Sequence, residues 1–300
     1  MLSVVITAWN EAQNLPRVVE SVRKLADEIV VVVDQSSTDG TKQVATKLGC
    51  TVYSHAHSGF VEPMRNYSIS KAKNDWVLLL DADEEIPSGL GQKIKSLISR
   101  SDVDYYRLPR KNIIFNKWIK SQHWWPDYVY RLFKKGHITW EDTIHSVPFT
   151  RGRGEDLPSH ESLAIIHHHY DSVSQYLDRI NRYTDHQLRH LHDNNHRFSP
   201  ADLIVYPVKE FLSQYFARRG YSEGLHGLAL SLLQAYSELV LYLKFWETLK
   251  FPQNKFTPGD LNNELRKTNN ELSWWYYQSK IDSAPFVLKP WWKFIRRLKV

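Results

Sequence analysis

One short stretch, residues 74–87 (NDWVLLLDADEEIP), constrains the fold of this chain more than any other. Its apolar run from 76 to 80 is short and continuous, which is typical of a strand buried on both faces of a parallel sheet covered by helices. The run ends abruptly in the acidic sequence DADEE at 81–85. Ligands of open α/β sheets bind beyond the carboxyl ends of the strands, so this acidic sequence falls where a binding site is expected.

Asp81 and Asp83 are candidate metal ligands. They stand two positions apart, which in an extended chain puts both side chains on the same side. Two carboxylates at a strand tip suit Mg²⁺ or Mn²⁺, with substrate phosphate and water completing the coordination. The alternative is that Asp83 and the two glutamates after it cap the next helix, whose first turn favours negative charge. The spacing alone leaves both interpretations open.

Strand-like and helix-like patterns alternate ahead of this run. Buried strands are predicted at 3–8, 28–33 and 51–54, and helices from Leu15, from about 41 to 48 and from 65 to 73. Alternation of this length is typical of a doubly wound, mostly parallel α/β sheet. The glycine signatures of dinucleotide sites and P-loops are missing. Phosphate charge would therefore be met by a metal and by basic side chains such as Arg65.

Charge and composition narrow the class of partner. The net charge of +6 and the pI of about 9.1 predict an anionic partner, either nucleotide phosphates, an acidic membrane or nucleic acid. No aromatic-basic motif of a nucleic-acid module is present, so nucleic acid is disfavoured. The single cysteine, Cys50, rules out an internal disulfide, and the apolar N-terminal run is too short for a signal peptide. We therefore expect a cytoplasmic protein.

Four motifs follow one another at characteristic spacing over about the first 90 residues. They are VVITAWNEAQNLPRVVESV, VVVDQSSTDGT, the pair Arg65-Asn66, and WVLLLDADEEIP. Together they resemble the nucleotide-sugar half of the family-2 inverting glycosyltransferases, which have the GT-A fold. The middle of the chain, through IIHHHYDSVSQYLDRINRYT, is similar to the lipopolysaccharide core β-1,4-glucosyltransferases and related enzymes of surface glycans, which often use UDP-glucose.

The resemblance implies roles for individual residues. Contacts with the nucleotide sugar would come from Thr7, Ala8, Asn10, Glu11, Asp34, Arg65, Asp81 and Ala82. The D-x-D motif would hold the metal, with Asp83 as the more direct ligand beside Asp81, and His167 would reach the metal or the diphosphate. Two alternatives stay open from the residues themselves. Asp34 also suits a plain turn, and His167 shares one face of a strand with His169, as a packed pair would.

The catalytic base is the least defined of these roles. Inverting transfer needs a carboxylate that takes the proton of the acceptor hydroxyl. Related sequences commonly carry His-Glu where this chain has His145-Ser146, so the expected glutamate is missing. The candidates, in order, are Asp142, Glu141 and His145, and the alternative is that 141–142 form a solvated turn. Trp140 is a candidate to stack on a sugar ring or, equally, a core residue.

The chain changes character near residue 170, which predicts two domains. Residues 1–170 would form the GT-A nucleotide-sugar-binding and catalytic domain, and residues 171–300 a mainly helical region. A long helix is expected from about 176 to 191. An apolar stripe at helical spacing follows between Leu225 and Leu243, but polar residues interrupt it, so packing rather than a membrane span is expected.

The tail PWWKFIRRLKV supports a further interpretation of the helical region. Trp291 and Trp292 beside Lys293, Arg296 and Arg297 have the composition of an interfacial anchor. Docking of the acceptor or of an anionic membrane surface is therefore the alternative to simple packing. The protein would then be peripheral on the cytoplasmic face of the membrane.

These patterns and the resemblance lead to one main hypothesis. The chain is expected to be a metal-dependent (Mn²⁺ or Mg²⁺) inverting hexosyltransferase of surface-glycan or lipopolysaccharide biosynthesis. It would move one sugar, glucose or another hexose, from a UDP-sugar to a saccharide or glycolipid acceptor. Single transfer is expected because the Q-x-x-R-W motif of processive members is missing. The alternative is a catalytically degenerate GT-A-like protein that binds carbohydrate or membrane, as the missing glutamate at position 146 would suggest.

Overall fold

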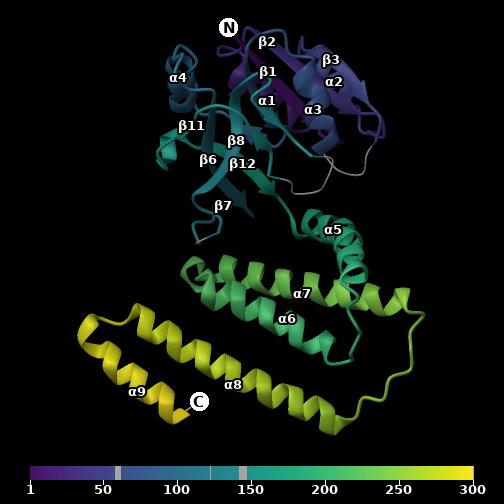
Figure 1. Cartoon of the computed structure of the whole chain (residues 1–300), viewed down its shortest axis with the longest axis vertical. Helices are drawn as coiled ribbons and strands as arrows, with labels where there is room; N and C mark the ends of the chain where they lie inside the picture. The colour runs from purple at the N-terminus through teal and green to yellow at the C-terminus, as the bar shows by residue number, and fades with distance from the viewer. Residues whose placement is uncertain (58–61, 122, 142–146, 300) are drawn as a thin grey trace. The chain divides into compact units, whose positions relative to one another are not determined.

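The computed structural model describes residues 1–57, 62–121, 123–141 and 147–299. The chain divides into two compact units (Figure 1). The first unit contains Met1–Ile119 and Trp124–His169, and the second contains Lys120–His123 and Tyr170–Val300. Strands dominate the first unit and helices the second.

A mixed, mostly parallel sheet forms the first unit. Four strands run parallel in the spatial order β3 (Thr51–His55), β2 (Glu28–Asp34), β1 (Leu2–Ala8) and β4 (Trp76–Asp81). The sheet continues through β8 (Asp127–Lys134), β6 (Tyr105–Ile114), β12 (Ile165–Tyr170) and β5 (Glu84–Glu85), with β8 antiparallel to both β4 and β6. The predicted α/β class and the predicted strands are confirmed.

Helices cover both faces of this sheet. Apolar residues of α1 (Leu15–Val22), α2 (Thr41–Lys47) and α4 (Ser88–Leu97) pack on one face, and those of α3 (Glu62–Ser70) on the other. All seven residues of β1 are buried, and alternate side chains enter opposite layers of core, as the period of a strand requires. This two-sided burial explains the uninterrupted apolar runs in the sequence.

The third helix differs from its predicted bounds of 65–73. It begins earlier, at Glu62, where Pro63 in the first turn has no N–H to leave unpaired. It ends at Ser70, because the N–H groups of Lys71 and Ala72 bond three residues back, to Ser68 and Ile69, and tighten the last turn.

Short elements complete the first unit. They are β7 (Lys117–Trp118), β9 (Ile138–Thr139), β10 (Phe149–Thr150), β11 (Gly154–Asp156) and the 3₁₀ turn η1 (Glu161–Leu163). Strands β9 and β10 pair with each other outside the main sheet, whereas β7 and β11 both pair with β6.

The second unit is helical, as expected. Its helices are α5 (Val173–Asp193), α6 (Asp202–Leu212), α7 (Leu225–Thr248), α8 (Pro258–Ser283) and α9 (Lys289–Lys299), with short turns η2 (Ser213–Ala217), η3 (Gly220–Glu223) and η4 (Phe286–Leu288). Helix α7 packs against α5 and α6, and α9 packs against α8. Within the described residues, α7 alone is long and apolar enough to cross a membrane by length and composition. The apolar stripe predicted between Leu225 and Leu243 lies on this helix.

Candidate functional site

The D-x-D motif lies at the point where the strand order reverses. From β1, the chain builds β2 and β3 outward on one side and then places β4 on the other. Thr7 is the register partner of Asp81, and its hydroxyl donates to Asp81 Oδ1 at 3.3 Å. Asp34 ends the neighbouring strand β2. Such a switch point is the usual ligand site of an open α/β sheet.

Asp81 and Asp83 do not share one face of an extended strand, so that expectation is wrong. Strand β4 ends at Asp81, and Ala82 and Asp83 form a turn before β5. The alternative expectation, that residues 83–85 cap the next helix, is also wrong, since α4 begins at Ser88 and has no acidic residue in its first turn. Glu84 is instead fully buried, and it accepts a hydrogen bond from the Asp81 N–H at 3.1 Å.

Two arginines bind the Asp81 carboxylate. Arg65 donates to Asp81 Oδ2 at 3.1 Å, and Arg131 donates to the same oxygen. Burial alone would raise the pKa of Asp81, but the charges of Arg131 and Arg65 outweigh it and hold that pKa well below its ordinary value. Asp81 is therefore an ionised carboxylate already compensated by cations. Its role as a metal ligand, and the role of Arg65 at the nucleotide, stay predictions.

A buried ion-pair network extends from this carboxylate. Arg131 on β8 also donates to Glu84 at 2.9 Å. Arg110 on β6 links Glu84, at 3.2 Å, to Asp127, at 2.7 Å. Buried charges are tolerated only when paired and hydrogen-bonded, and in this network each of them has a partner. The bond from the Asp81 N–H to Glu84 connects the backbone of the D-x-D turn to this network. Sequence reasoning missed Arg110, Asp127 and Arg131 because nothing local marks them.

His167 lies opposite the D-x-D turn through strand pairing. Strand β12 runs antiparallel to β5, and His167 is the register partner of Glu84. The His167 Nε2 atom is 3.3 Å from Asp83 Oδ2, and its Nδ1 atom is 2.6 Å from Asn112 Oδ1. The amide nitrogen of Asn112 donates to Asp127 at 3.0 Å, which turns its oxygen toward the imidazole. His167 therefore donates from Nδ1 to Asn112, and its Nε2 faces both Asp83 Oδ2 and His169 Nδ1.

This arrangement fits a divalent cation. Asp83 Oδ2 and His167 Nε2 lie close enough to bind one cation together. Carboxylate oxygen and imidazole nitrogen suit Mn²⁺, and the second nitrogen held by an amide is the usual outer support of a metal-binding histidine. No three acidic, histidine or cysteine side chains in the described ranges are grouped to hold a metal unaided. Substrate oxygens and water would have to complete its coordination.

The alternative of a packed histidine pair also describes part of the geometry. The rings of His167 and His169 lie 4.5 Å apart, and His169 Nδ1 is 3.2 Å from His167 Nε2. The ring of Trp124 lies 5.4 Å from that of His169. Packing therefore orients His167, and it coexists with the approach of His167 to Asp83.

Asp34 is held in a fixed orientation at the end of β2. Its Oδ1 accepts from the N–H and the hydroxyl of Ser36 at 2.8 and 2.7 Å, and its Oδ2 lies 2.9 Å from His57 Nδ1. Burial would raise the pKa of Asp34, but the bonds from Ser36 and His57 lower it. Asp34 thus makes the bonds of an Asx turn, the plain alternative, and its carboxylate stays ionised. Ser36 was detectable as part of an Asp-x-Ser turn, whereas His57 carries no local signal.

Hydrogen bonds connect the loop after β1 to the loop after β2. Asn10 adopts a left-handed conformation with φ of 54°, and its side-chain oxygen accepts from the Thr38 N–H at 2.8 Å. The Glu11 N–H donates to the Thr41 hydroxyl at 2.8 Å, and the Glu11 carboxylate accepts from Asn14. These bonds give Asn10 and Glu11 a structural function. Contacts of Thr7, Ala8, Asn10, Glu11 and Ala82 with a nucleotide sugar stay predictions.

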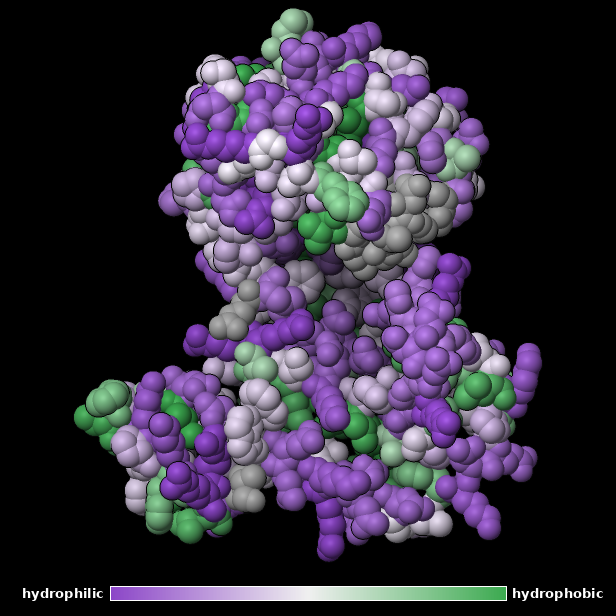
Figure 2. Space-filling model, viewed as in Figure 1, coloured by the Kyte–Doolittle hydropathy of each residue, from purple (hydrophilic) through white to green (hydrophobic). Residues whose placement is uncertain are grey.

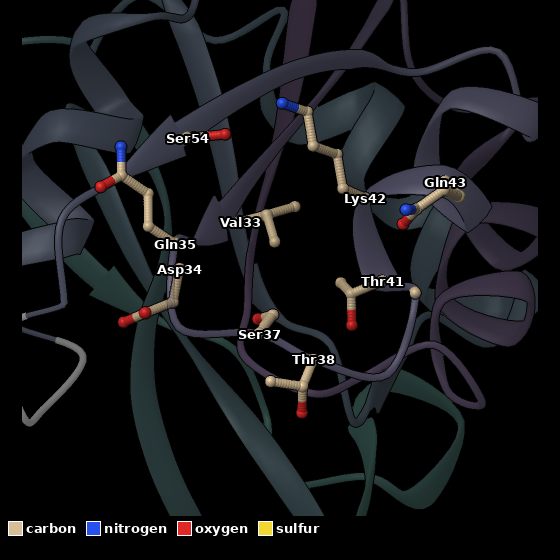
Figure 3. Close-up of a pocket in the computed structure, with 10 residues that line it drawn as sticks. Val33, Asp34, Gln35, Ser37, Thr38, Thr41, Lys42, Gln43 and Ser54 are labelled. Carbon is tan, nitrogen blue, oxygen red and sulfur yellow. The ribbon is translucent and has the colours of Figure 1, made fainter.

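A polar pocket of ≈ 340 Å³ lies beside the end of β2 (Figure 3). Its lining contains Asp34 but none of the D-x-D residues. Figure 3 shows Ser37 and Thr38 along the loop that leads into α2, and Thr41 and Lys42 at the start of α2. The lining combines hydroxyl, amide and amino groups with the apolar side chain of Val33.

One of the three candidate bases lies in the part of the chain that the structure describes. Glu141 is exposed, whereas Asp142 and His145 lie outside the described residues. Trp140 is buried; its backbone exchanges hydrogen bonds with the side chain of Asn66 at 2.7 and 3.0 Å, and its ring packs against Phe133. Trp140 is therefore a core residue, which was one of the two predictions for it.

Sequence comparison finds relatives among proteins of Rickettsia. A chain of Rickettsia felis described as an uncharacterized glycosyltransferase is 26% identical over 288 residues, covering 89% of this chain and 97% of the relative. An uncharacterized glycosyltransferase of Rickettsia typhi is 29% identical over 256 residues, covering 82% of this chain and 87% of the relative.

Two solved structures align with most of this chain at low similarity. The Staphylococcus aureus protein TarS (residues 1–349, with UDP) aligns with a TM-score of 0.42 and 15% identity, over 86% of this chain and 94% of TarS. A mannosyltransferase of Pyrobaculum calidifontis, with GDP-mannose and Mn²⁺, aligns with a TM-score of 0.43 and 14% identity, over 85% of this chain and 76% of that one.

The family assignment depends on the first unit. The model of the family described as glycosyl transferase family 2 matches residues 3–153, about half of the chain. The match contains the switch point, Asp34 and the D-x-D turn, and it ends before β12 and His167. This chain is a glycosyltransferase and belongs to glycosyl transferase family 2.

Proposed function

We propose that the enzyme transfers a single hexose, glucose or a related sugar, from a UDP-sugar to a saccharide or glycolipid acceptor, with inversion at the anomeric carbon. A bound Mn²⁺ or Mg²⁺ would assist the reaction. Acceptors of surface-glycan or lipopolysaccharide biosynthesis are the proposed class, because the middle of the chain resembles enzymes of that subgroup. The approach of His167 Nε2 to Asp83 Oδ2 at 3.3 Å is the observation that carries the proposal.

Asp83 and His167 would hold the metal at the end of β4. When bound, the cation supplies Lewis-acid stabilisation of the negative charge that develops on the departing diphosphate. The hydrogen bond to Asn112 keeps Nε2 of His167 directed toward Asp83, and Asp127 keeps Asn112 in place. Arg65 pairs with Asp81 of the D-x-D motif and would contribute positive charge near the phosphates. Asp34 would accept a bond from the uracil or the ribose at the neighbouring strand end.

A side chain from the segment after Trp140 would act as the general base. Asp142 is our first candidate, followed by Glu141 and then His145. The base takes the proton of the acceptor hydroxyl as that oxygen attacks the anomeric carbon from the face opposite the diphosphate. The bond from the anomeric carbon to the diphosphate oxygen breaks in the same step, and UDP leaves with the bonding electrons. The base is the one protein group that gains a proton in this step.

Calorimetric titration with UDP, in the presence and absence of Mn²⁺, tests the donor and the metal together. We expect Mn²⁺ to tighten the binding of UDP at least about tenfold, since even the outer partners of a metal site contribute about 10–100-fold to metal affinity. Asp83→Asn should abolish this tightening while leaving the thermal unfolding temperature near that of the wild type. Asp102→Asn is the matched control, because Asp102 is an exposed carboxylate of the same unit.

A degenerate binding protein gives a different result in the same titration. If the wild type binds UDP equally well with and without Mn²⁺, or does not bind it, the metal-dependent proposal is wrong. If Mn²⁺ does tighten the binding of UDP, a screen of nucleotide sugars for slow metal-dependent hydrolysis identifies the donor without knowledge of the acceptor. Hydrolysis by the wild type and none by Asp142→Asn or Asp83→Asn is the expected pattern.

A further inference from the structure

The C-terminal end of the helical unit exposes an unusual amount of apolar surface. In the turn η4, Phe286 is 87% exposed and Val287 79%. In helix α9, Trp291 is 58%, Phe294 54% and Leu298 64% exposed. We call these five residues the apolar tip. Green surface gathers at the lower left of Figure 2, where Figure 1 draws η4 and α9. Large exposed apolar patches usually mark an interaction site.

Helix α9 has three distinct sides. Trp292, Ile295 and Arg296 are half-buried, and the Arg296 guanidinium lies 5.0 Å from the ring of Trp274 on α8. Trp291, Phe294 and Leu298 recur at helical spacing on a second side that is open. Lys293 and Arg297 are exposed and four residues apart, which places them together on a third side. The helix is therefore anchored on one side and offers an apolar and a basic side to solvent.

The basic character of the whole chain is concentrated in this tail. Residues 284–300 contain Lys289, Lys293, Arg296, Arg297 and Lys299 and no acidic residue. The remaining 283 residues contain 34 basic and 33 acidic ones, so nearly all of the net charge of +6 comes from the last 17 residues. The charge is therefore local to the apolar tip and is not a property of the general surface.

We infer that η4 and α9 form a docking surface for an anionic lipid membrane. An apolar face of Trp, Phe and Leu beside a Lys/Arg face is the composition of a helix that lies in the membrane interface. Rings and aliphatic side chains of the apolar tip would enter the boundary between headgroups and acyl chains. Lys293 and Arg297 would meet lipid phosphates or carboxylates.

The charge favours a membrane over a protein partner as the occupant. A protein that covered the apolar tip would have to supply several acidic groups to the same small area, whereas an anionic leaflet supplies them everywhere. The inference adds a binding surface to the enzyme and does not depend on the proposed donor, because vesicle binding is measured without nucleotide.

Flotation of the full-length protein with vesicles tests this inference. We expect binding to vesicles of equal parts phosphatidylcholine and phosphatidylglycerol, and much weaker binding to phosphatidylcholine alone. The double variant Lys293→Gln/Arg297→Gln should bind the anionic vesicles about 25-fold more weakly, since each basic residue near an anionic surface contributes about fivefold. High salt should reduce wild-type binding by screening the same charges. The double variant Phe294→Ser/Leu298→Ser should weaken vesicle binding about tenfold. High salt should reduce the binding of this variant more than that of the wild type, because its remaining attraction is mainly electrostatic.

A matched control separates a local surface from general charge. Lys93→Gln/Lys95→Gln removes two exposed lysines from α4 in the other unit and should bind like the wild type. An equal loss in the control, equal binding to neutral and anionic vesicles, or no vesicle binding by the wild type would each overturn the inference.

Sedimentation without lipid tests the remaining occupants. A dimer that Phe294→Ser/Leu298→Ser converts to a monomer would assign the apolar tip to a second copy of this chain and overturn the membrane inference. A monomer in both cases supports it. Unchanged circular dichroism of each variant shows that the result does not come from unfolding.

Discussion

The two units of this protein use apolar and charged side chains in opposite ways. In the strand-rich unit, apolar side chains such as those of β1 are fully buried, and charged groups pair below the D-x-D turn. In the helical unit, large apolar side chains of η4 and α9 stay exposed beside a stretch of basic sequence without acidic residues. The first pattern makes a rigid site, because the buried charges of Glu84 and Arg131 are paired. The second makes a surface whose burial requires something outside the chain.

This contrast teaches where stability and function are coupled. Near the D-x-D turn, Arg131 and Asn112 belong to the core and to the site at once, so a change in either should affect both. In the helical unit, local devices such as caps and single buried groups should act with small, separate effects. The following predictions test the contrast in order of decreasing size.

Loss of Arg131 should produce the largest effect. Arg131→Met leaves the carboxylates of Asp81 and Glu84 without their shared cation, and breaking a buried pair costs about 3–5 kcal/mol. Chemical denaturation measures the free energy of unfolding. Arg107→Met is the control, because its ion pair with Asp156 is exposed and should contribute below about 1 kcal/mol. Similar losses in both variants would contradict the rigid-site interpretation.

Loss of Asn112 should weaken metal binding in addition to its effect on folding. Asn112→Leu removes the acceptor that fixes Nδ1 of His167, and loss of such an outer partner reduces metal affinity about 10–100-fold. Calorimetry with Mn²⁺ and UDP measures this change. Asn263→Leu, at an exposed position on α8, should leave the affinity unchanged. Unaltered Mn²⁺ affinity in Asn112→Leu would mean that His167 does not contact the metal.

Glu238 should make the helical unit sensitive to pH. Burial, and then the like charge of Glu210, raise the pKa of Glu238 to about 7, from an ordinary value of 4.5. The folded state binds this proton more tightly than the unfolded state, so stability is highest below pH 4.5 and falls as pH rises to about 7.

The variant Glu238→Gln isolates this effect. It should abolish the pH-dependent loss and stabilise the helical unit at pH above 7 by up to about 2 kcal/mol, allowing for partial solvent contact. Thermal unfolding at a series of pH values measures it. Glu247→Gln, exposed on the same helix, should change little. A flat wild-type profile would contradict the prediction.

The capping box of α8 should have the smallest effect. The Thr257 hydroxyl accepts from the Asp260 N–H at 3.2 Å, and Asp260 accepts from the Thr257 N–H at 2.8 Å. Thr257→Ala should cost about 1 kcal/mol, confined to the first turns of α8, as hydrogen exchange would show. Thr268→Ala in the middle of the helix should slow exchange slightly, because alanine has the higher helix propensity.

Local pattern in the sequence was enough to determine the framework of the strand-rich unit. The strands at 3–8, 28–33, 51–54 and 76–80 and the long helix that became α5 were predictable, because burial on both faces leaves apolar runs and amphipathic helices leave a 3.6-residue period. The position of Asp34 and Asp81 at strand ends followed from those runs. Motif order then indicated the family.

Only the tertiary structure decided how the site is held. His167 meets Asp83 through the pairing of β12 with β5, and Arg131, Arg110 and Asn112 come from strands that pair far along the chain. The turn at Ala82 and Asp83 depends on Glu84 being drawn into the buried network, which no local period encodes. Sequence pattern reports which face of an element is buried, whereas strand register sets which distant residues meet, and the chemistry of this site is a property of register.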